Sequence, residues 1–459
     1  MASDHDSSSG SASGLRSPTI KFLIIAALTV AMAIPLFLIQ LALSDREERA
    51  AEATADIANG WGGPQVVAGP ILLLPYTVPS EQTIDGRAVQ TLNRETAVIL
   101  PETLAIRTDA QEGTRWRGIF SVPVYRAGIT MHATFAKDAI VQGVPAGATI
   151  LWNAASVSIL VSDTHGLADN VFVKVNGQTI ALQPGGSLAA QLPVPNSSAT
   201  TPINGMHAPV ALPGPADLIL DSTFSLRGSR ELSFAPLGRR TTATMQSGWK
   251  SPSFFGAFLP SERKIDKDGF TASWVVPYLA RGFGQAFATQ DQAAPVILTP
   301  ASGVRFYQPV DFYQLVERSL KYAILFIALA FLTFFVVETV SPKQLHVIQY
   351  ALVGAAQALF YLLLLSFSEH IGFAGAYAVA TGATVVLTAL YAMSVLADKL
   401  RAAVLAVILG GLYGLLYVIL NAEDFALLIG SAVLFAALAA TMYVTRKIDW
   451  FRTAQAVPA

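Results

Sequence analysis

Long apolar blocks lie near the start and in the last third of the chain, on either side of a long segment of mixed polarity. The first block, residues 21–43, has no charged residue after Lys21. As a helix it is long enough to cross a hydrocarbon core of about 30 Å. A cleaved signal peptide is the alternative, but the block exceeds the usual apolar length of about 7–15 residues. We therefore predict an uncleaved membrane anchor.

Residues 1–20 before the anchor are small and polar for most of their length. Such a segment cannot bury enough apolar surface to fold, so we predict a disordered tail.

Residues 44–318 show apolar and polar positions in alternation. In ITMHATF, Ile129, Met131, Ala133 and Phe135 lie on one face, and LILDSTFSL and FTASWVV repeat the pattern. Such runs, bounded by Gly, Pro and Asn turns, are typical of antiparallel sheets with one buried face. We expect a large, sandwich-like, β-rich domain. The polar stretch at residues 193–210 is a candidate boundary between two subdomains.

From residue 319 to residue 445 the apolar blocks return. Five blocks are each long enough to span a bilayer, at residues 320–339, 347–367, 372–393, 402–420 and 425–444. Together with the anchor they predict six spans, so both termini would lie on one side, with a short tail at 446–459. The predicted fold is an α+β membrane protein with one N-terminal transmembrane helix, a β-rich domain and a five-helix C-terminal bundle.

The connecting segments differ in charge. RSPTIK, SPKQLH, ADKLR and TRKIDWFR, assigned to one face, contain Lys or Arg, whereas SEH and NAED on the other face contain acidic residues and no Lys or Arg. Basic loops remain cytoplasmic. We therefore predict cytoplasmic termini, with the β-rich domain and the two acidic turns on the outer side.

Composition narrows the classes of function. Only 13% of the 459 residues are charged, and the net charge is −1, so no broad basic surface for nucleic acid is expected. The chain has no cysteine, which excludes disulfides, thiolate metal sites and cysteine nucleophiles. Motifs for nucleotide binding, hydrolase nucleophiles and zinc are also lacking. We predict no catalytic, cofactor-binding or metal-binding residues, and no cofactor.

Six charged residues at the predicted membrane interfaces are the candidate functional groups: Lys321, Glu338, Glu369, His370, Glu423 and Asp424. The acidic turns are explained simply as solvated loops, because a helical hairpin needs few polar residues to turn. Alternatively they converge with Arg318 and Lys321 in a buried site for proton sensing or relay. Glu338 lies either at the headgroup level or within the membrane.

The stretch GWKSPSFFGAFLPSERKIDKDGFTASWVV resembles the signature of the CreD family of bacterial inner-membrane proteins, and the likeness continues to about Phe451. Its matching residues are Pro252, Ser253, Phe254, Gly256, Leu259, Pro260, Gly269, Phe270 and Trp274. The resemblance implies a multi-pass inner-membrane protein with a large periplasmic domain, linked to cell-envelope integrity. It supplies no catalytic residues.

Three functions follow as hypotheses. The first is a non-enzymatic envelope-integrity factor that binds or senses an envelope component through its periplasmic domain. The second is an enzyme that handles envelope lipid or peptidoglycan. The third is a small-molecule or proton-coupled transporter that uses Glu369, His370, Glu423 and Asp424. The expected partners are the lipid bilayer and periplasmic envelope components, with no nucleic acid.

Overall fold

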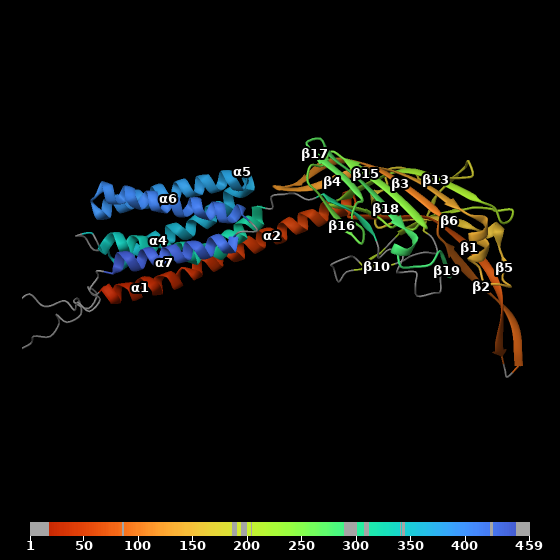
Figure 1. The fold of residues 1–459 in the computed structure, drawn as a ribbon, viewed down its shortest axis with the longest axis horizontal. Helices are drawn as coiled ribbons and strands as arrows, with labels where there is room; N and C mark the ends of the chain where they lie inside the picture. Colours follow the sequence, from red (N-terminus) through yellow and green to blue (C-terminus); the bar gives the residue numbers. More distant parts are fainter. Residues whose placement is uncertain are drawn as a thin grey trace, which may run out of the picture. The chain divides into compact units, whose positions relative to one another are not determined.

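The computed structural model describes most of the chain, in two compact units (Figure 1). The described residues are 18–84, 87–185, 191–193, 200–202, 204–288, 301–306, 312–339, 341, 345–422 and 426–446. The helical unit comprises Met1–Arg49 with Val310–Ala459, and the β unit comprises Ala50–Pro309. Each unit is described by itself.

The β unit contains two large sheets. The ten-stranded sheet is built from β1 (Gln65–Ile84), β2 (Arg87–Ile99), β5 (Thr149–Ile150), β6 (Ser156–Val161), β9 (Gln183–Pro184), β12 (Asn204–Pro209), β14 (Glu231–Phe234), β16 (Pro252–Gly256), β19 (Ala286–Ala288) and β20 (Ser302–Phe306). Its main order is β16-β20-β14-β1-β6-β12-β9, and β2 extends from β1 as a long hairpin.

The eight-stranded sheet has the order β17-β18-β15-β3-β4-β13-β7-β8. These strands are β3 (Thr103–Arg117), β4 (Phe120–Phe135), β7 (Phe172–Val175), β8 (Gln178–Ala181), β13 (Leu218–Ser229), β15 (Arg240–Ser247), β17 (Glu262–Asp266) and β18 (Gly269–Pro277). A separate pair is formed by β10 (Gln191–Pro193) and β11 (Thr200–Pro202), and α3 (Lys137–Gln142) follows β4.

The predicted large β-rich region is confirmed. Its apolar and polar residues alternate in β4 because one face of the eight-stranded sheet is buried and the other is exposed. Ile129, Met131 and Ala133 of β4 are buried, whereas Thr130 and His132, which alternate with them, are exposed. One continuous core contains side chains of both sheets, such as Ile71 of β1 with those of β4. Residues 204–209 of the candidate internal boundary form β12, between β6 and β9.

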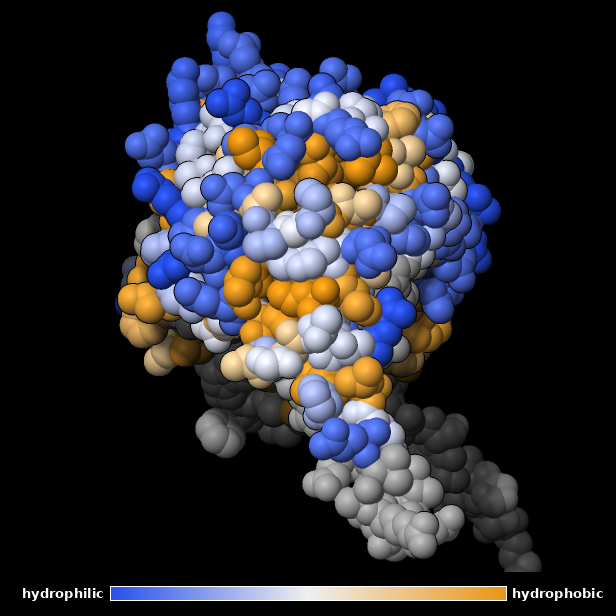
Figure 2. Space-filling model, turned by 90° about the vertical axis from the view of Figure 1, so that its right-hand side faces the viewer, coloured by the Kyte–Doolittle hydropathy of each residue, from blue (hydrophilic) through white to orange (hydrophobic). Residues whose placement is uncertain are grey.

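The face of the β unit that Figure 2 shows carries many hydrophilic side chains, with apolar patches between them. Scattered exposed apolar residues are normal for folded domains, so these patches alone do not mark a binding site.

The helical unit begins with α1 (Pro18–Ala31) and the first part of α2 (Ala33–Trp61), which are separated at Met32. Pro35 explains the interruption, because it has no N–H to donate to the carbonyl of Ala31. The remaining helices are α4 (Phe312–Thr339), α5 (Val347–Leu396), α6 (Lys399–Asn421) and α7 (Ala426–Thr445).

Four helical segments among the described residues are long and apolar enough to cross a membrane: Ile20–Trp61, Phe312–Thr339, Val347–Leu396 and Lys399–Asn421. This count differs from the six predicted spans. The sequence predicts separate helices at 347–367 and 372–393, whereas the structure assigns both to α5. The predicted span at 425–444 corresponds to α7, which is not among the four segments.

The 50 residues of α5 do not form one straight rod. Gly372 has φ 74° and ψ 165°, which is not helical. The ring centroids of Phe360 and Tyr377 lie 5.4 Å apart, although 17 residues would separate them by about 25 Å along a straight helix. The helix therefore folds back at Gly372 into two limbs, residues 347–371 and 373–396. Helical residues continue past the predicted turn at Ser368–His370.

Candidate functional site

Glu338 lies near the end of α4 and is buried, with 6% of its surface exposed. Its carboxylate forms an ion pair with Lys21 of α1. It also accepts hydrogen bonds from the Leu345 amide at 2.7 Å and from the Tyr350 hydroxyl at 2.7 Å. A buried charge is costly unless it is paired and hydrogen-bonded, and here both conditions hold. We call these four residues the Glu338 tie.

Glu369 lies on the first limb of α5, and its side chain is 6% exposed. Oε1 accepts a hydrogen bond from the Tyr313 hydroxyl at 3.2 Å and lies 3.7 Å from Nε of Arg46. Arg46 belongs to the part of α2 within the helical unit. These three residues form the Glu369 tie. Glu369 is thus a paired group within the helical unit and not a freely solvated loop residue.

The other predicted charges do not join this tie in the described part of the chain. His370 is exposed, and its Nδ1 lies 3.1 Å from the carbonyl oxygen of Ser366. Lys321 pairs with Glu317 at 3.0 Å, one turn away on α4. Such exposed pairs contribute little to stability. Glu423 and Asp424 lie outside the described residues.

Sequence reasoning missed the cationic partners, Lys21 and Arg46. Each is remote in sequence from its carboxylate, and local spacing cannot reveal such pairs. One signal was present in the sequence. Lys21 and Arg46 lie near the two ends of the first apolar block, and Glu338 and Glu369 lie near the ends of later apolar blocks. Matching opposite charges across separate spans would have suggested both ties.

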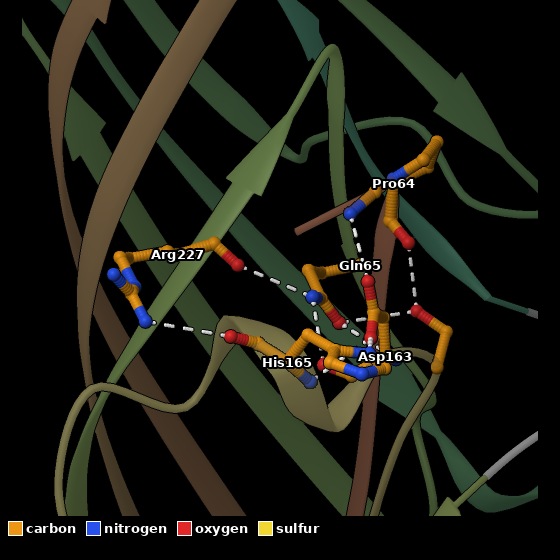
Figure 3. Close-up of polar contacts among 7 residues, drawn as sticks. Pro64, Gln65, Asp163, His165 and Arg227 are labelled. Carbon is orange, nitrogen blue, oxygen red and sulfur yellow. Dashed lines mark hydrogen bonds and ion pairs between the residues drawn. The ribbon is translucent and has the colours of Figure 1, made fainter. Parts of the chain in front are cut away.

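A third polar cluster lies where α2 ends and β1 begins (Figure 3). Gly62 follows Trp61 with φ 126°, and a Cβ there would come 2.7 Å from the carbonyl oxygen of Arg227. Only glycine fits this approach. The Gly63 amide then donates to Oδ2 of Asp163 at 3.0 Å, and the Ser229 amide donates to the Gly63 carbonyl at 3.1 Å.

Gln65, the first residue of β1, is 1% exposed and is at the centre of this junction cluster (Figure 3). Its amide nitrogen donates to the carbonyl oxygens of Asp163 at 3.0 Å and Arg227 at 3.2 Å. Its amide oxygen accepts from the Ser162 hydroxyl at 3.1 Å and the Asp163 amide at 3.2 Å. All four hydrogen-bonding positions of the side chain are therefore used.

Asp163 completes the junction cluster. Its Oδ1 accepts from the His165 amide at 2.9 Å, and the His165 ring lies at the same distance. Burial alone would raise the pKa of Asp163. Hydrogen bonds from the Gly63 and His165 amides, together with the His165 ring, outweigh burial and lower the pKa below its usual value.

Trp61 fixes the end of α2 to the β unit. The guanidinium carbons of Arg115 and Arg227 lie 4.2 and 5.2 Å from the centroid of the Trp61 ring. The indole N–H donates to the Tyr125 carbonyl at 3.4 Å. Cation–π contacts of this kind contribute about 0.5–2 kcal/mol each. The cluster therefore joins helix and sheets through several modest interactions.

Packing explains several of the residues between Pro252 and Trp274 that carry the resemblance to the family signature. The ring centroid of Phe254 lies 5.7 Å from that of Phe270 and 6.0 Å from that of Trp274. The Trp274 N–H donates to the Phe258 carbonyl at 3.2 Å. Gly269 has φ 129°, and a Cβ there would lie 2.0 Å from the Ser247 carbonyl. Pro252, Ser253 and Gly256 belong to β16, whereas Leu259 is exposed beside Pro260.

The described residues offer few groups suited to metal binding or acid–base catalysis. Among them, no three His, Asp or Glu side chains gather in an arrangement that could hold a metal ion. An open hollow of about 340 Å³ is lined by polar residues that include Asp109, Lys264 and Asp266. Lys264 lies 3.3 Å from Asp266. The Asp268 amide and Lys264 lower the pKa of Asp266, so this carboxylate is a poor general base.

Long apolar helices in one unit, with a two-sheet β unit inserted after the first of them, define the class: an α+β membrane protein with a large β-rich region. The chain matches the family described as Inner membrane protein CreD over residues 17–451. It is 32% identical over 430 residues to Inner membrane protein CreD of Escherichia coli (strain K12), covering 91% of this chain and 90% of that protein. The chain belongs to the CreD family.

The Glu338 tie yields a first prediction. In Glu338→Ala, Lys21 loses its carboxylate inside the helical unit, which should cost about 3–5 kcal/mol. We expect a clearly lower thermal unfolding midpoint for the purified full chain in detergent. Glu317→Ala is the matched control on α4, because it breaks an exposed pair and should cost about 0.5 kcal/mol or less.

Replacing both charged groups shows whether the stability is lost through the unpaired charge of Lys21 or through lost side-chain packing. Lys21→Met with Glu338→Leu removes both charges and should recover most of the lost stability. Equal midpoints for Glu338→Ala and Glu317→Ala, or no recovery in the double variant, would contradict the tie.

The junction cluster yields a prediction about pH. Because the folded pKa of Asp163 is lowered, its stabilising effect is present above the unfolded pKa of about 3.9 and is lost as pH falls through the folded value. Asp163→Asn should lower the free energy of unfolding by about 1 kcal/mol at pH 7. That difference from wild type should shrink below about pH 4.

The measurement is urea unfolding of the full chain in detergent, followed by circular dichroism from pH 7 to pH 3. The exposed Asp169→Asn is the control and should show no such convergence. If the difference in free energy of unfolding between wild type and Asp163→Asn stays constant with pH, the charge of Asp163 does not contribute to stability.

Proposed function

We propose that this chain is a six-span protein of the bacterial inner membrane, with cytoplasmic termini and the β unit in the periplasm. The two limbs of α5, divided at Gly372, are each about 36 Å long, which suits a hydrocarbon core of about 30 Å. α7 adds 20 residues, or about 30 Å. The basic and acidic loops of the sequence support the orientation.

The spacing of the two ties supports this arrangement. Lys21 and Arg46 are 25 residues apart, or about 37 Å along helix. A bilayer with its headgroups is about 40–45 Å thick. One tie would therefore lie near each membrane surface, where a charged group costs less than at the centre. The Glu338 tie belongs to the cytoplasmic side, and the Glu369 tie belongs to the periplasmic side.

Within that arrangement we propose an envelope-integrity factor that binds or senses an envelope component through its β unit. The observation that carries this proposal is the pairing of Glu338 and Glu369 with cations of the N-terminal helices. Carboxylates held in this way link spans to one another. The helical unit then acts as an anchor, and the β unit is the part that meets other molecules.

The two alternatives receive less support. A transporter needs ionisable groups that can exchange partners with a substrate or proton, whereas Glu338 and Glu369 already have cationic partners and hydroxyl donors. An enzyme needs a base or nucleophile poised in a cleft. In the described hollow, Asp266 is stabilised as its anion.

Complementation of a deletion strain tests this proposal. Deletion should alter cell shape or sensitivity to detergent. Glu369→Ala should restore growth in detergent nearly as well as wild type, because it leaves Arg46 partly exposed and should cost only about 1 kcal/mol. Glu317→Ala is the matched control, and immunoblots of membranes establish equal protein levels.

The transporter hypothesis predicts a different outcome. Glu369→Ala would then abolish complementation while the protein stays at its normal level in the membrane. That result would overturn the anchor proposal. A deletion with normal shape and normal detergent resistance would overturn the integrity role.

A further inference from the structure

Four exposed polar side chains form a row across one face of the eight-stranded sheet. The register of neighbouring strands places them in one line: Asp109 of β3, Gln246 of β15, Thr271 of β18 and Lys264 of β17. Neighbouring strands lie about 4.8 Å apart, so the line covers about 14 Å. We call these four residues the polar row.

The polar row belongs to the open hollow of about 340 Å³ on the β unit, and the turn between β17 and β18 supplies further polar groups. Asp266 and Asp268 of this turn also line the hollow. Gly269 lets the turn pack closely on β15, because a Cβ there would lie 2.0 Å from the carbonyl oxygen of Ser247. The volume falls within the range of about 300–1,000 Å³ that small-molecule sites occupy.

The polar groups of the row are available to a ligand. Within the residues that the structure describes, the side chains of Asp109, Gln246 and Thr271 have no hydrogen-bond or ion-pair partner. Lys264 pairs with Asp266 at 3.3 Å, but its side chain is 81% exposed, and such pairs are weak. The ammonium group has three N–H donors, so it can donate to a ligand as well.

The lining of the hollow disfavours several classes of ligand. It contains three carboxylates, those of Asp109, Asp266 and Asp268, against the one cation of Lys264, so it repels anions such as phosphates. Among the described residues, no three His, Asp or Glu side chains are arranged to hold a metal ion. Phe270 is only 4% exposed and gives an apolar ligand little surface to cover.

Hydroxyl groups fit this set of side chains best. A hydroxyl both donates and accepts hydrogen bonds, so it can donate to Asp109 and accept from Lys264 or from the amide of Gln246. An ammonium group only donates, and it would leave the N–H groups of Lys264 and Gln246 unused.

We propose that the hollow binds a neutral, hydroxyl-rich ligand, namely a sugar unit of an envelope glycan. This inference rests on the proposed function, because it names the class of envelope component that the β unit binds. The polar row makes the hydrogen bonds to the sugar, and the turn at Asp266 and Asp268 forms the side of the site.

Binding is measured with the purified full chain in nanodiscs of phosphatidylcholine, which has no sugar in its headgroup. The neutral probes are the linear tetramers of N-acetylglucosamine and of glucose. The linear tetramer of glucosamine is the third probe, because it carries ammonium groups in place of the acetamido groups. Saturation-transfer NMR detects binding, and a titration gives Kd.

We expect at least one neutral tetramer to bind at millimolar concentration. Gln246→Ala and Asp109→Asn should each raise its Kd at least about fivefold, because each removes a hydrogen-bonding group from the site. Thr244→Ala and Glu262→Gln are the matched controls. Both positions are exposed on strands of the same sheet and lie outside the lining of the hollow, so their Kd should change by less than about twofold. Equal thermal unfolding midpoints establish that all four variants are folded.

Three results would overturn this inference. The first is no binding of either neutral tetramer, and the second is an equal loss of affinity in the row variants and the control variants. The third is binding of the glucosamine tetramer alone, which would show that the hollow recognises an ammonium group. All three concern the hollow only. The deletion phenotype tests the envelope role separately, so normal complementation beside a failed binding experiment leaves the proposed function in place.

Discussion

Glu338 places a carboxylate inside a bundle of apolar helices, and Lys21 from the other end of the chain neutralises it. Because Glu338 is buried among the helices, its charge has little access to water and depends on Lys21 and on its hydrogen-bond donors. This ion pair links α1 to α4. Packing reinforces the pair: the rings of Phe22 and Phe335 lie 6.0 Å apart.

Because α1 pairs with α4, the helical unit is assembled from segments on both sides of the β unit in the sequence. The β unit is inserted between α2 and α4, so the chain that enters it and the chain that leaves it both belong to the helical unit. At the entrance, Gln65 and Asp163 connect the end of α2 to the sheets with a fully used set of hydrogen bonds.

Local pattern predicted the β-rich region and the apolar helices, because burial of alternate residues along a strand and continuous apolar runs are local signals. It placed the turn between two spans at Ser368–His370, whereas the helix continues through these residues and folds back at Gly372. A helix can continue through polar residues when their side chains find hydrogen-bond or ionic partners. The ties were half predicted: Glu338 and Glu369 were candidates, but Lys21 and Arg46 are more than 300 residues away from them. The junction cluster was missed, because Gln65 and Asp163 have no motif.

The N-terminal helix packs on the C-terminal helices through Lys21 and Phe22. Phe22→Cys with Phe335→Cys, joined by a short bismaleimide crosslinker in native membranes, tests this packing after the β unit is cut with protease. We expect the two fragments to stay covalently linked on a denaturing gel, whereas an exposed pair such as Phe37→Cys with Val407→Cys gives separate fragments. Separate fragments for the Phe22–Phe335 pair, at full labelling of both cysteines, would contradict this packing.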